Sequence, residues 1–123
     1  MNKESYEAIF YNLPDGTEPA LEFIKSLDIK MRAKIEKSIF LLQQVGPELR
    51  LPYSEYLEDG IFEIRAKQGS NITRVLYFFF VGKKIILTNG FVKKTRKTPK
   101  EQLALAKKYR DDYKSREAKN DKI

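Results

Sequence analysis

The chain has 123 residues, of which 41% are hydrophobic and 12% aromatic, and these shares are typical of a folded globular protein. One domain over residues 1–123 is expected, because this length supports one hydrophobic core but not two. The net charge is +7, from 24 basic and 17 acidic residues, which favours nucleic acid or an acidic protein as partner. Histidine and cysteine are absent, which excludes disulfides and removes the commonest general base and metal ligand.

Several other classes of protein are excluded by what the sequence lacks. No apolar run approaches the roughly 18 residues of a membrane span, and no signal-peptide stretch follows Met1 to Glu4, so we expect a cytoplasmic protein without membrane contact. A phosphate-binding Gly-rich loop and a nucleophile elbow are both missing. Glu55, Glu58 and Asp59 fall in a predicted loop and form no convincing metal site, so we expect neither cofactor nor metal.

The first half of the chain predicts one strand followed by a pair of helices. Ser5 to Asn12 is a short aromatic and aliphatic run that ends at the turn signal Leu13-Pro14-Asp15-Gly16, which indicates a strand. Thr17-Glu18-Pro19 opens a first helix, and a second helix ends at Gly46-Pro47. Their inward positions recur at helical spacing and are Ala20, Ile24 and Leu27, then Met31, Ile35, Ser38, Ile39 and Leu42. Two such helices form a hairpin whose apolar faces need a sheet to cover.

The second half predicts that sheet. Ile61 to Lys67 alternates between apolar and polar residues, Thr73 to Val81 is almost continuously apolar, and Ile85 to Val92 forms a further strand. The turns between these strands are expected at Gly69-Ser70-Asn71 and Gly82-Lys83-Lys84.

A last helix is predicted after the sheet. Thr98-Pro99-Lys100-Glu101 gives it a Thr cap, a Pro at the first position and a Glu three residues after the cap. It is expected to run to about Arg116, with a frayed tail over Asn120 to Ile123. The order strand, helix, helix, three strands, helix predicts an α+β domain built on an antiparallel sheet.

Two arginines in the predicted strands are candidates for chemistry. Arg65 lies at the centre of the polar face of its strand, together with Glu63 and Lys67. Arg74 interrupts an otherwise apolar strand. An arginine among apolar residues either pairs with a carboxylate or lies at the rim of a cleft. Arg74 therefore has two interpretations, as the structural partner of Glu63 or as a cation that binds phosphate.

A basic loop follows the last predicted strand. Lys93, Lys94, Arg96 and Lys97 place four cations within five positions, directly after the strand and close to Phe91. A charge run of this kind is often only a solvated surface. Here it is short, held between two regular elements and next to an aromatic ring, and cations beside a stackable ring are the arrangement that binds single-stranded RNA.

Three segments of the second half resemble the signature segments of the phage-derived, HigB-like branch of the RelE/ParE toxins. They are Ile61-Phe62-Glu63-Ile64-Arg65, Thr73-Arg74-Val75-Leu76-Tyr77 and Asn89-Gly90-Phe91-Val92-Lys93-Lys94-Thr95, the last leading to Thr98-Pro99. They occur in the order and spacing of the family. With the helical hairpin before them and the helix after them, the resemblance covers nearly the whole chain.

The resemblance implies a RelE-like microbial RNase fold and the toxin of a type II toxin–antitoxin system. Such toxins enter the A site of the 70S ribosome, cut mRNA there and arrest translation. Arg65 and Arg74 match the two sheet arginines of the family, Lys93 and Lys94 match its cations at the end of the last strand, and Phe91 lies near an aromatic position that faces mRNA. The implied protein partner is a cognate antitoxin, a small helix-turn-helix protein of the HigA type.

The residues fit a metal-independent cleavage in which the RNA 2′-hydroxyl attacks the adjacent phosphate. Arg65 and Arg74 suit the phosphate, because a guanidinium is permanently charged and binds through two parallel hydrogen bonds. Lys93, Lys94 and Glu63 are the candidates for the base, while relatives often use His or Tyr in this region. Lys67, Arg96, Lys97 and Phe91 are candidates for RNA binding.

Two other interpretations share the same fold. A ParE-like inhibitor would act on DNA gyrase by binding, without RNA chemistry. A degenerate toxin would bind its partner and arrest nothing. Because one fold can support different functions, the fold alone does not separate these three possibilities.

Overall fold

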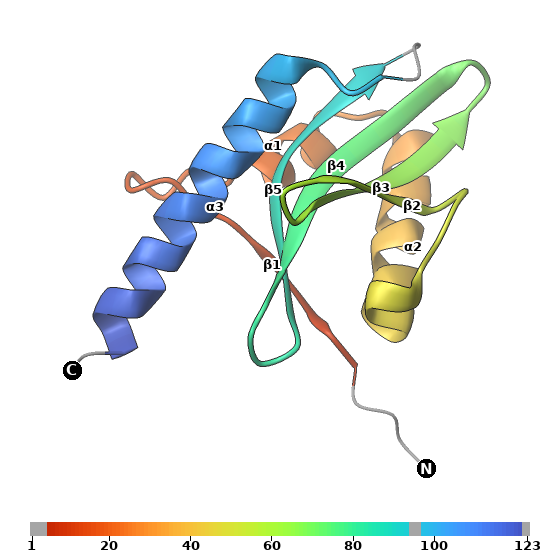
Figure 1. Cartoon of the computed structure of the whole chain (residues 1–123). Helices are drawn as coiled ribbons and strands as arrows, with labels where there is room; N and C mark the ends of the chain where they lie inside the picture. The colour runs from red at the N-terminus through yellow and green to blue at the C-terminus, as the bar shows by residue number, and fades with distance from the viewer. Residues whose placement is uncertain (1–4, 94–96, 122–123) are drawn as a thin grey trace.

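The computed structural model describes residues 5–93 and 97–121 (Figure 1). Its elements in chain order are β1 (Glu7–Phe10), α1 (Pro19–Lys25), α2 (Ile29–Val45), the short 3-10 helix η1 (Gly46–Glu48), β2 (Ser54–Glu58), β3 (Ile61–Gln68), β4 (Asn71–Phe80), β5 (Lys84–Lys93) and α3 (Lys100–Asp121). The α+β class and the predicted order of elements are therefore confirmed, with β2 as an addition. The first strand is shorter than predicted, and the last helix continues beyond Arg116.

The five strands form one sheet in the order β1-β5-β4-β3-β2, and this sheet is mixed. The prediction of an antiparallel sheet was wrong for its first strand, because β1 pairs parallel with the Lys84–Leu87 part of β5. The other three pairings are antiparallel. An alternating pattern shows which face a side chain takes but not the direction of the neighbouring strand, so the sequence did not reveal this pairing.

Strand β2 was missed, and its residues were wrongly assigned to a loop. It pairs with the first half of β3 at the edge of the sheet, with a bulge between Tyr56 and Glu58. Glu55 and Glu58 give the strand the charged character that is common in edge strands, and this hides the alternation of a half-buried strand.

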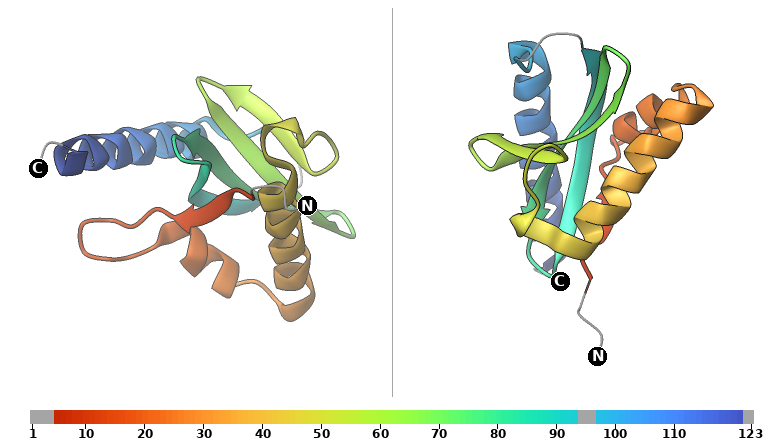
Figure 2. Two further views of the ribbon diagram at one scale, coloured as in Figure 1. Left: turned by 90° about the horizontal axis from the view of Figure 1, so that it is seen from below. Right: turned by 90° about the vertical axis from the view of Figure 1, so that its right-hand side faces the viewer.

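Helices cover both faces of the sheet, as the right-hand view in Figure 2 shows. α1 and α2 pack on one face, and the core there includes Ile24, Ile35, Leu42, Ile64, Tyr77 and Leu87. α3 packs on the other face, over a second core that includes Ile61, Leu76, Phe78, Ile86 and Ala106. Successive residues of β4 alternate between the two cores, which is why this strand is apolar almost throughout.

The helices are fixed by local contacts and by contacts with the sheet. The Asp28 carboxylate accepts a hydrogen bond of 2.8 Å from the Met31 amide and caps α2. Near the other end of the chain, the Tyr11 hydroxyl donates to Asp112 at 2.7 Å, which ties α3 to the segment after β1. Within the described residues, none of the helices has both the length and the apolar character needed to cross a membrane.

Candidate functional site

The register of β3, β4 and β5 brings six of the predicted site residues to the α3 face of the sheet. Arg65 pairs with Arg74, and Arg74 pairs with Phe91, so these three form one row across the strands. The neighbouring rows are Glu63–Leu76–Asn89 and Lys67–Ile72–Lys93. Because paired residues share a face and the face repeats every second residue, all three rows lie on the same side. The candidate site consists of these three rows, next to the start of α3.

The two arginines differ in their access to solvent. The side chain of Arg65 is 21% exposed, whereas that of Arg74 is 2% exposed. Arg65 lies on β3 just beyond its pairing with β2, so one side of it is open, while Arg74 is enclosed in the central strand β4. Only Arg65 is therefore placed to touch a ligand directly.

Glu63 links both arginines and the start of α3. Its side chain is fully buried. One carboxylate oxygen, Oε2, accepts a 2.5 Å hydrogen bond from Arg65 Nε and lies 3.7 Å from Arg74 Nη1. The other oxygen, Oε1, accepts a 2.8 Å hydrogen bond from the Thr98 hydroxyl. A buried carboxylate needs such partners, because burial without them is costly.

The alternative in which Arg74 pairs with Glu63 is thus the arrangement that the structure shows. It does not remove the phosphate-binding interpretation of the site, because Arg65 bonds to the same carboxylate and remains open on one side. Glu63 holds two guanidinium groups through one carboxylate oxygen, and its other oxygen is bonded to Thr98.

Two residues that the sequence did not single out for the site also belong to it. Glu55 of β2 forms an ion pair with Arg65 Nη2, so Arg65 bridges two carboxylates. Thr98, predicted only as a helix cap, donates its hydroxyl to Glu63. The two contacts join residues that are 10 and 35 positions apart, and no local pattern indicates them.

Asn89 holds the start of α3 against the sheet. Its side-chain amide donates to the backbone oxygen of Gln102 at 3.2 Å and to Gln102 Oε1 at 2.9 Å. Asn89 is buried in the row beside Arg74 and Phe91. The position of α3 relative to the two arginines is therefore fixed by Asn89 and Thr98 together.

The remaining predicted residues lie around this centre. Phe91 is half-buried and packs on the core below α3, and Lys93 is half-buried at the end of β5. Lys67 and Lys97 are exposed. Lys94 and Arg96 lie outside the described residues.

The arrangement offers cations and an aromatic ring rather than a metal site. Over the described ranges, no group of three or more His, Cys, Asp or Glu residues is arranged to hold a metal ion. What the site presents is an arginine with one open side, held in position by carboxylates, next to lysines at the strand ends. This combination suits a phosphate group, which accepts hydrogen bonds from a guanidinium and is attracted by ammonium groups.

Comparison with known protein families gives a match. The family model described as "Phage derived protein Gp49-like (DUF891)" matches residues 22–111, from within α1 to the first half of α3. The matched range includes every predicted site residue. No curated protein matches the chain.

Proposed function

This chain belongs to the Gp49-like family of phage-derived proteins, a RelE/ParE-like toxin family, and we propose that it acts as a ribosome-dependent mRNA endoribonuclease. The family indicates the toxin of a toxin–antitoxin pair. In the proposal the protein is of the HigB-like kind, arrests translation by cutting mRNA on the 70S ribosome, and is neutralised by a helix-turn-helix antitoxin of the HigA type.

The observation that carries this proposal is the row formed by Arg65, Arg74 and Phe91, with Lys67 and Lys93 in the next row. A sheet face with cations and a half-buried ring suits single-stranded RNA, because the backbone is bound by charge and a base can stack. Gyrase inhibition by binding alone does not require an arginine held by two carboxylates.

The proposed reaction needs no co-reactant. The 2′-oxygen of one nucleotide attacks the adjacent phosphorus while its proton passes to a base. The bond between phosphorus and the 5′-oxygen breaks, and that oxygen receives a proton. The products are a 2′,3′-cyclic phosphate and a 5′-hydroxyl. Negative charge grows on the phosphate during the attack, and a preorganised cation lowers the barrier at that step.

Arg65 is the proposed catalytic cation, because it alone of the two arginines has an open side. Arg74 and Glu63 are proposed as positioning residues that act through Arg65. Glu55 and Glu63 fix the guanidinium from two directions, so little reorganisation is needed when phosphate charge develops. Glu63 is a poor candidate for the base, since both of its oxygens are engaged.

The proposed base is Lys93 or Lys94. Lys93 ends β5 in the row next to Arg74 and Phe91, where a neutral amine can accept the 2′-proton. In the free protein the 2′-hydroxyl is not held in line with the phosphate, so the free protein is expected to be a slow nuclease. The ribosome supplies the missing factor by orienting the substrate, and orientation contributes up to roughly 7–11 kcal/mol.

The test is inducible expression in a bacterium, followed by pulse labelling and mapping of mRNA ends. We expect protein synthesis to stop before DNA synthesis, with new mRNA 5′-ends inside translated regions. Arg65→Ala should remove both effects, while the matched control Arg32→Ala, on the exposed surface of α2, should leave them unchanged. Earlier loss of DNA synthesis would favour gyrase as the target, and normal growth would favour a degenerate toxin.

A further inference from the structure

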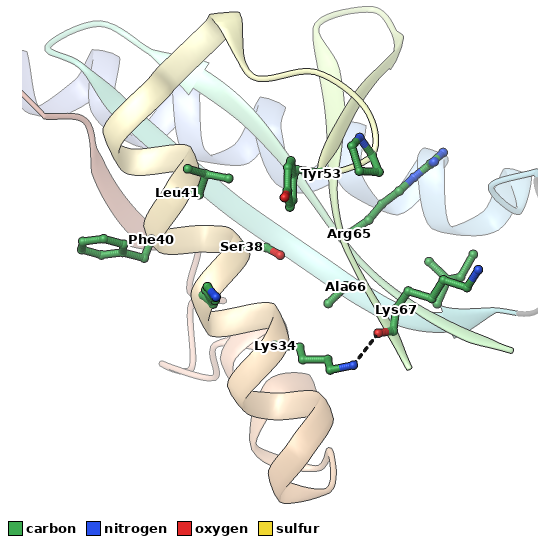
Figure 3. Close-up of a pocket in the computed structure, with 11 residues that line it drawn as sticks. Lys34, Ser38, Phe40, Leu41, Tyr53, Arg65, Ala66 and Lys67 are labelled. Atoms are coloured by element: carbon green, nitrogen blue, oxygen red, sulfur yellow. Dashed lines mark hydrogen bonds between the residues drawn. The ribbon is translucent and has the colours of Figure 1, made fainter. Parts of the chain in front are cut away.

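A groove lies on the side of the sheet away from α3, between α2 and the outer edge of β3 (Figure 3). Its volume is about 590 Å³. Leu41 of α2 points across it toward Tyr53, and Ala66 of β3 lies beside it (Figure 3). The groove is partly open to solvent, so it is suited to a segment of a larger partner rather than to an enclosed small molecule.

The groove combines an apolar lining with a cationic rim. The apolar residues are Phe40, Leu41, Pro52, Tyr53, Ala66 and Ile72. Its cations are Lys34 and Lys37 of α2, whereas the side chains of Arg65 and Lys67 at its β3 edge point away from α2 (Figure 3). Among the described residues that line it there is no carboxylate, and no ion pair joins Lys34, Lys37 or Lys67 to a described acidic residue. The groove therefore carries an unbalanced positive charge around an apolar floor.

Apolar surface continues beside the groove. Phe40, Leu51 and Tyr53 are exposed large hydrophobic residues at this end of the molecule. Exposed apolar side chains that gather around a concave surface are typical of protein interaction sites. In Figure 3 the ring of Phe40 turns away from the groove, so the apolar surface extends over the outer side of α2 as well.

The pairing between β2 and β3 also ends beside the groove. The Arg65 amide donates to the Tyr53 carbonyl at 2.8 Å, and β2 pairs no further along β3. Beyond that point the Lys67 carbonyl accepts a 3.0 Å hydrogen bond from Lys34 Nζ, across the groove (Figure 3). A flexible lysine at this position is easily displaced by a ligand, because it is exposed and its loss leaves the carbonyl open to solvent or to the ligand.

We propose that this groove binds an acidic amphipathic segment of a protein partner, with its apolar stripe on the groove floor and its carboxylates on the lysine rim. If the proposed function is right, on which this identification of the partner rests, the segment belongs to the antitoxin. Complementary charge sets the orientation of the segment, and burial of its apolar stripe supplies most of the affinity.

RNA is the less suitable occupant of this groove. Its phosphates would meet the lysines, but the mostly apolar lining offers only the Ser38 and Tyr53 hydroxyls to the sugar and to base edges. The rows of Arg65, Arg74 and Phe91 on the opposite face serve RNA better. We therefore expect RNA and the protein partner to bind on opposite faces of the sheet.

Arg65 lies at the β3 edge of the groove, but its guanidinium points away from α2 (Figure 3) and bonds to Glu63 and Glu55 on the opposite face. A segment bound in the groove and an RNA phosphate bound at Arg65 therefore use different sides of β3.

The direct test is an NMR titration of the ¹⁵N-labelled protein with three probes. The probes are an amphipathic leucine–glutamate peptide of about 16 residues, which spans about 24 Å as a helix, the same peptide with lysine for glutamate, and a single-stranded RNA oligonucleotide. We expect the acidic peptide to shift the signals of α2 and of the outer edge of β3, and the basic peptide to shift none. We expect RNA to shift the signals of the Arg65, Arg74 and Phe91 row. RNA shifts concentrated in the groove, or acidic-peptide shifts elsewhere, would overturn the proposal.

Matched variants extend the test to the antitoxin. Lys37 and Lys30 are both exposed on α2, but only Lys37 lines the groove. We expect Lys37→Glu to weaken peptide binding at least about tenfold and to escape neutralisation by the co-expressed antitoxin, whereas Lys30→Glu should behave as the parent protein. Both variants should stay toxic on their own. A parent protein that is not toxic would contradict the proposed function. Equal neutralisation of both variants by the antitoxin would show that the groove is not the antitoxin-binding site.

Discussion

The two arginines of the central row should respond to substitution in opposite ways. Arg65 and Arg74 are paired residues on adjacent strands and both face Glu63, yet their side chains are 21% and 2% exposed. We expect Arg74→Ala to lower stability much more than Arg65→Ala. We expect Arg65→Ala to lower the rate of RNA cleavage much more than Arg74→Ala.

The magnitudes follow from burial. Removing one partner of a buried ion pair costs about 3–5 kcal/mol, and the lower value applies here because Glu63 keeps Arg65 and Thr98. For a domain of this size 1 kcal/mol shifts the melting temperature by about 4 °C, so Arg74→Ala should melt about 12 °C lower. Arg65→Ala loses partly exposed contacts worth about 1–2 kcal/mol, or about 4–8 °C. Its cleavage rate should fall about 10²–10³-fold, which is the cost of one preorganised donor.

The assay pairs thermal melts with single-turnover cleavage on programmed ribosomes, at a temperature where both variants are folded. Arg65→Lys serves as a further control, since it keeps the charge but not the planar fork that bridges Glu55 and Glu63. The assignment of roles is refuted if Arg74→Ala melts like the parent and has lost cleavage, or if Arg65→Ala melts lowest and still cleaves.

Three further predictions concern stability and binding. Burial raises the pKa of Tyr77 to about 12, so the unfolded chain releases this proton near its ordinary value of 10.0 while the native protein keeps it. Stability should therefore fall as the pH rises between 10.0 and about 12, by urea unfolding, and less steeply in Tyr77→Phe; equal slopes would contradict this. Gly90→Ala should cost about 1–3 kcal/mol in the same measurement, because its methyl group would overlap the Phe23 ring, and an unchanged midpoint would show that the ring moves aside. RNA affinity should fall steeply between low and physiological salt, since bound lysines and arginines displace counterions; a flat dependence would exclude the electrostatic interface.

Side-chain alternation made much of the site predictable. Glu63, Arg65 and Lys67 were placed on one face of their strand from the sequence, and the structure agrees. The register that aligns Arg65 with Arg74 and Phe91 was not predictable, because it depends on turn lengths and on the irregularity between Leu76 and Tyr77 in the pairing of β4 with β5. Alternation is a local property, whereas register is set by the sheet as a whole.

Side-chain contacts between different elements could not be predicted from the sequence for the same reason. Thr98 has the pattern of a helix cap, and that pattern does not reveal that its hydroxyl donates to Glu63. The partner of Arg65 on β2, Glu55, lay in a segment whose charged and aromatic residues hide a strand. Buried polar groups need partners wherever the fold brings one close, so their bonds depend on tertiary structure rather than on neighbours in the chain.

The position of Arg65 has a consequence for how activity and neutralisation are connected. Its guanidinium pairs with Glu55 and Glu63 on the α3 face, whereas the groove lies on the α2 face. Substitution of Arg65 should then weaken cleavage, whereas Lys37→Glu should weaken antitoxin binding. Variants of Arg74 should affect neither contact directly, because that side chain is enclosed and does not line the groove. The three positions therefore separate catalysis, neutralisation and support of the fold, although two of them lie side by side on adjacent strands.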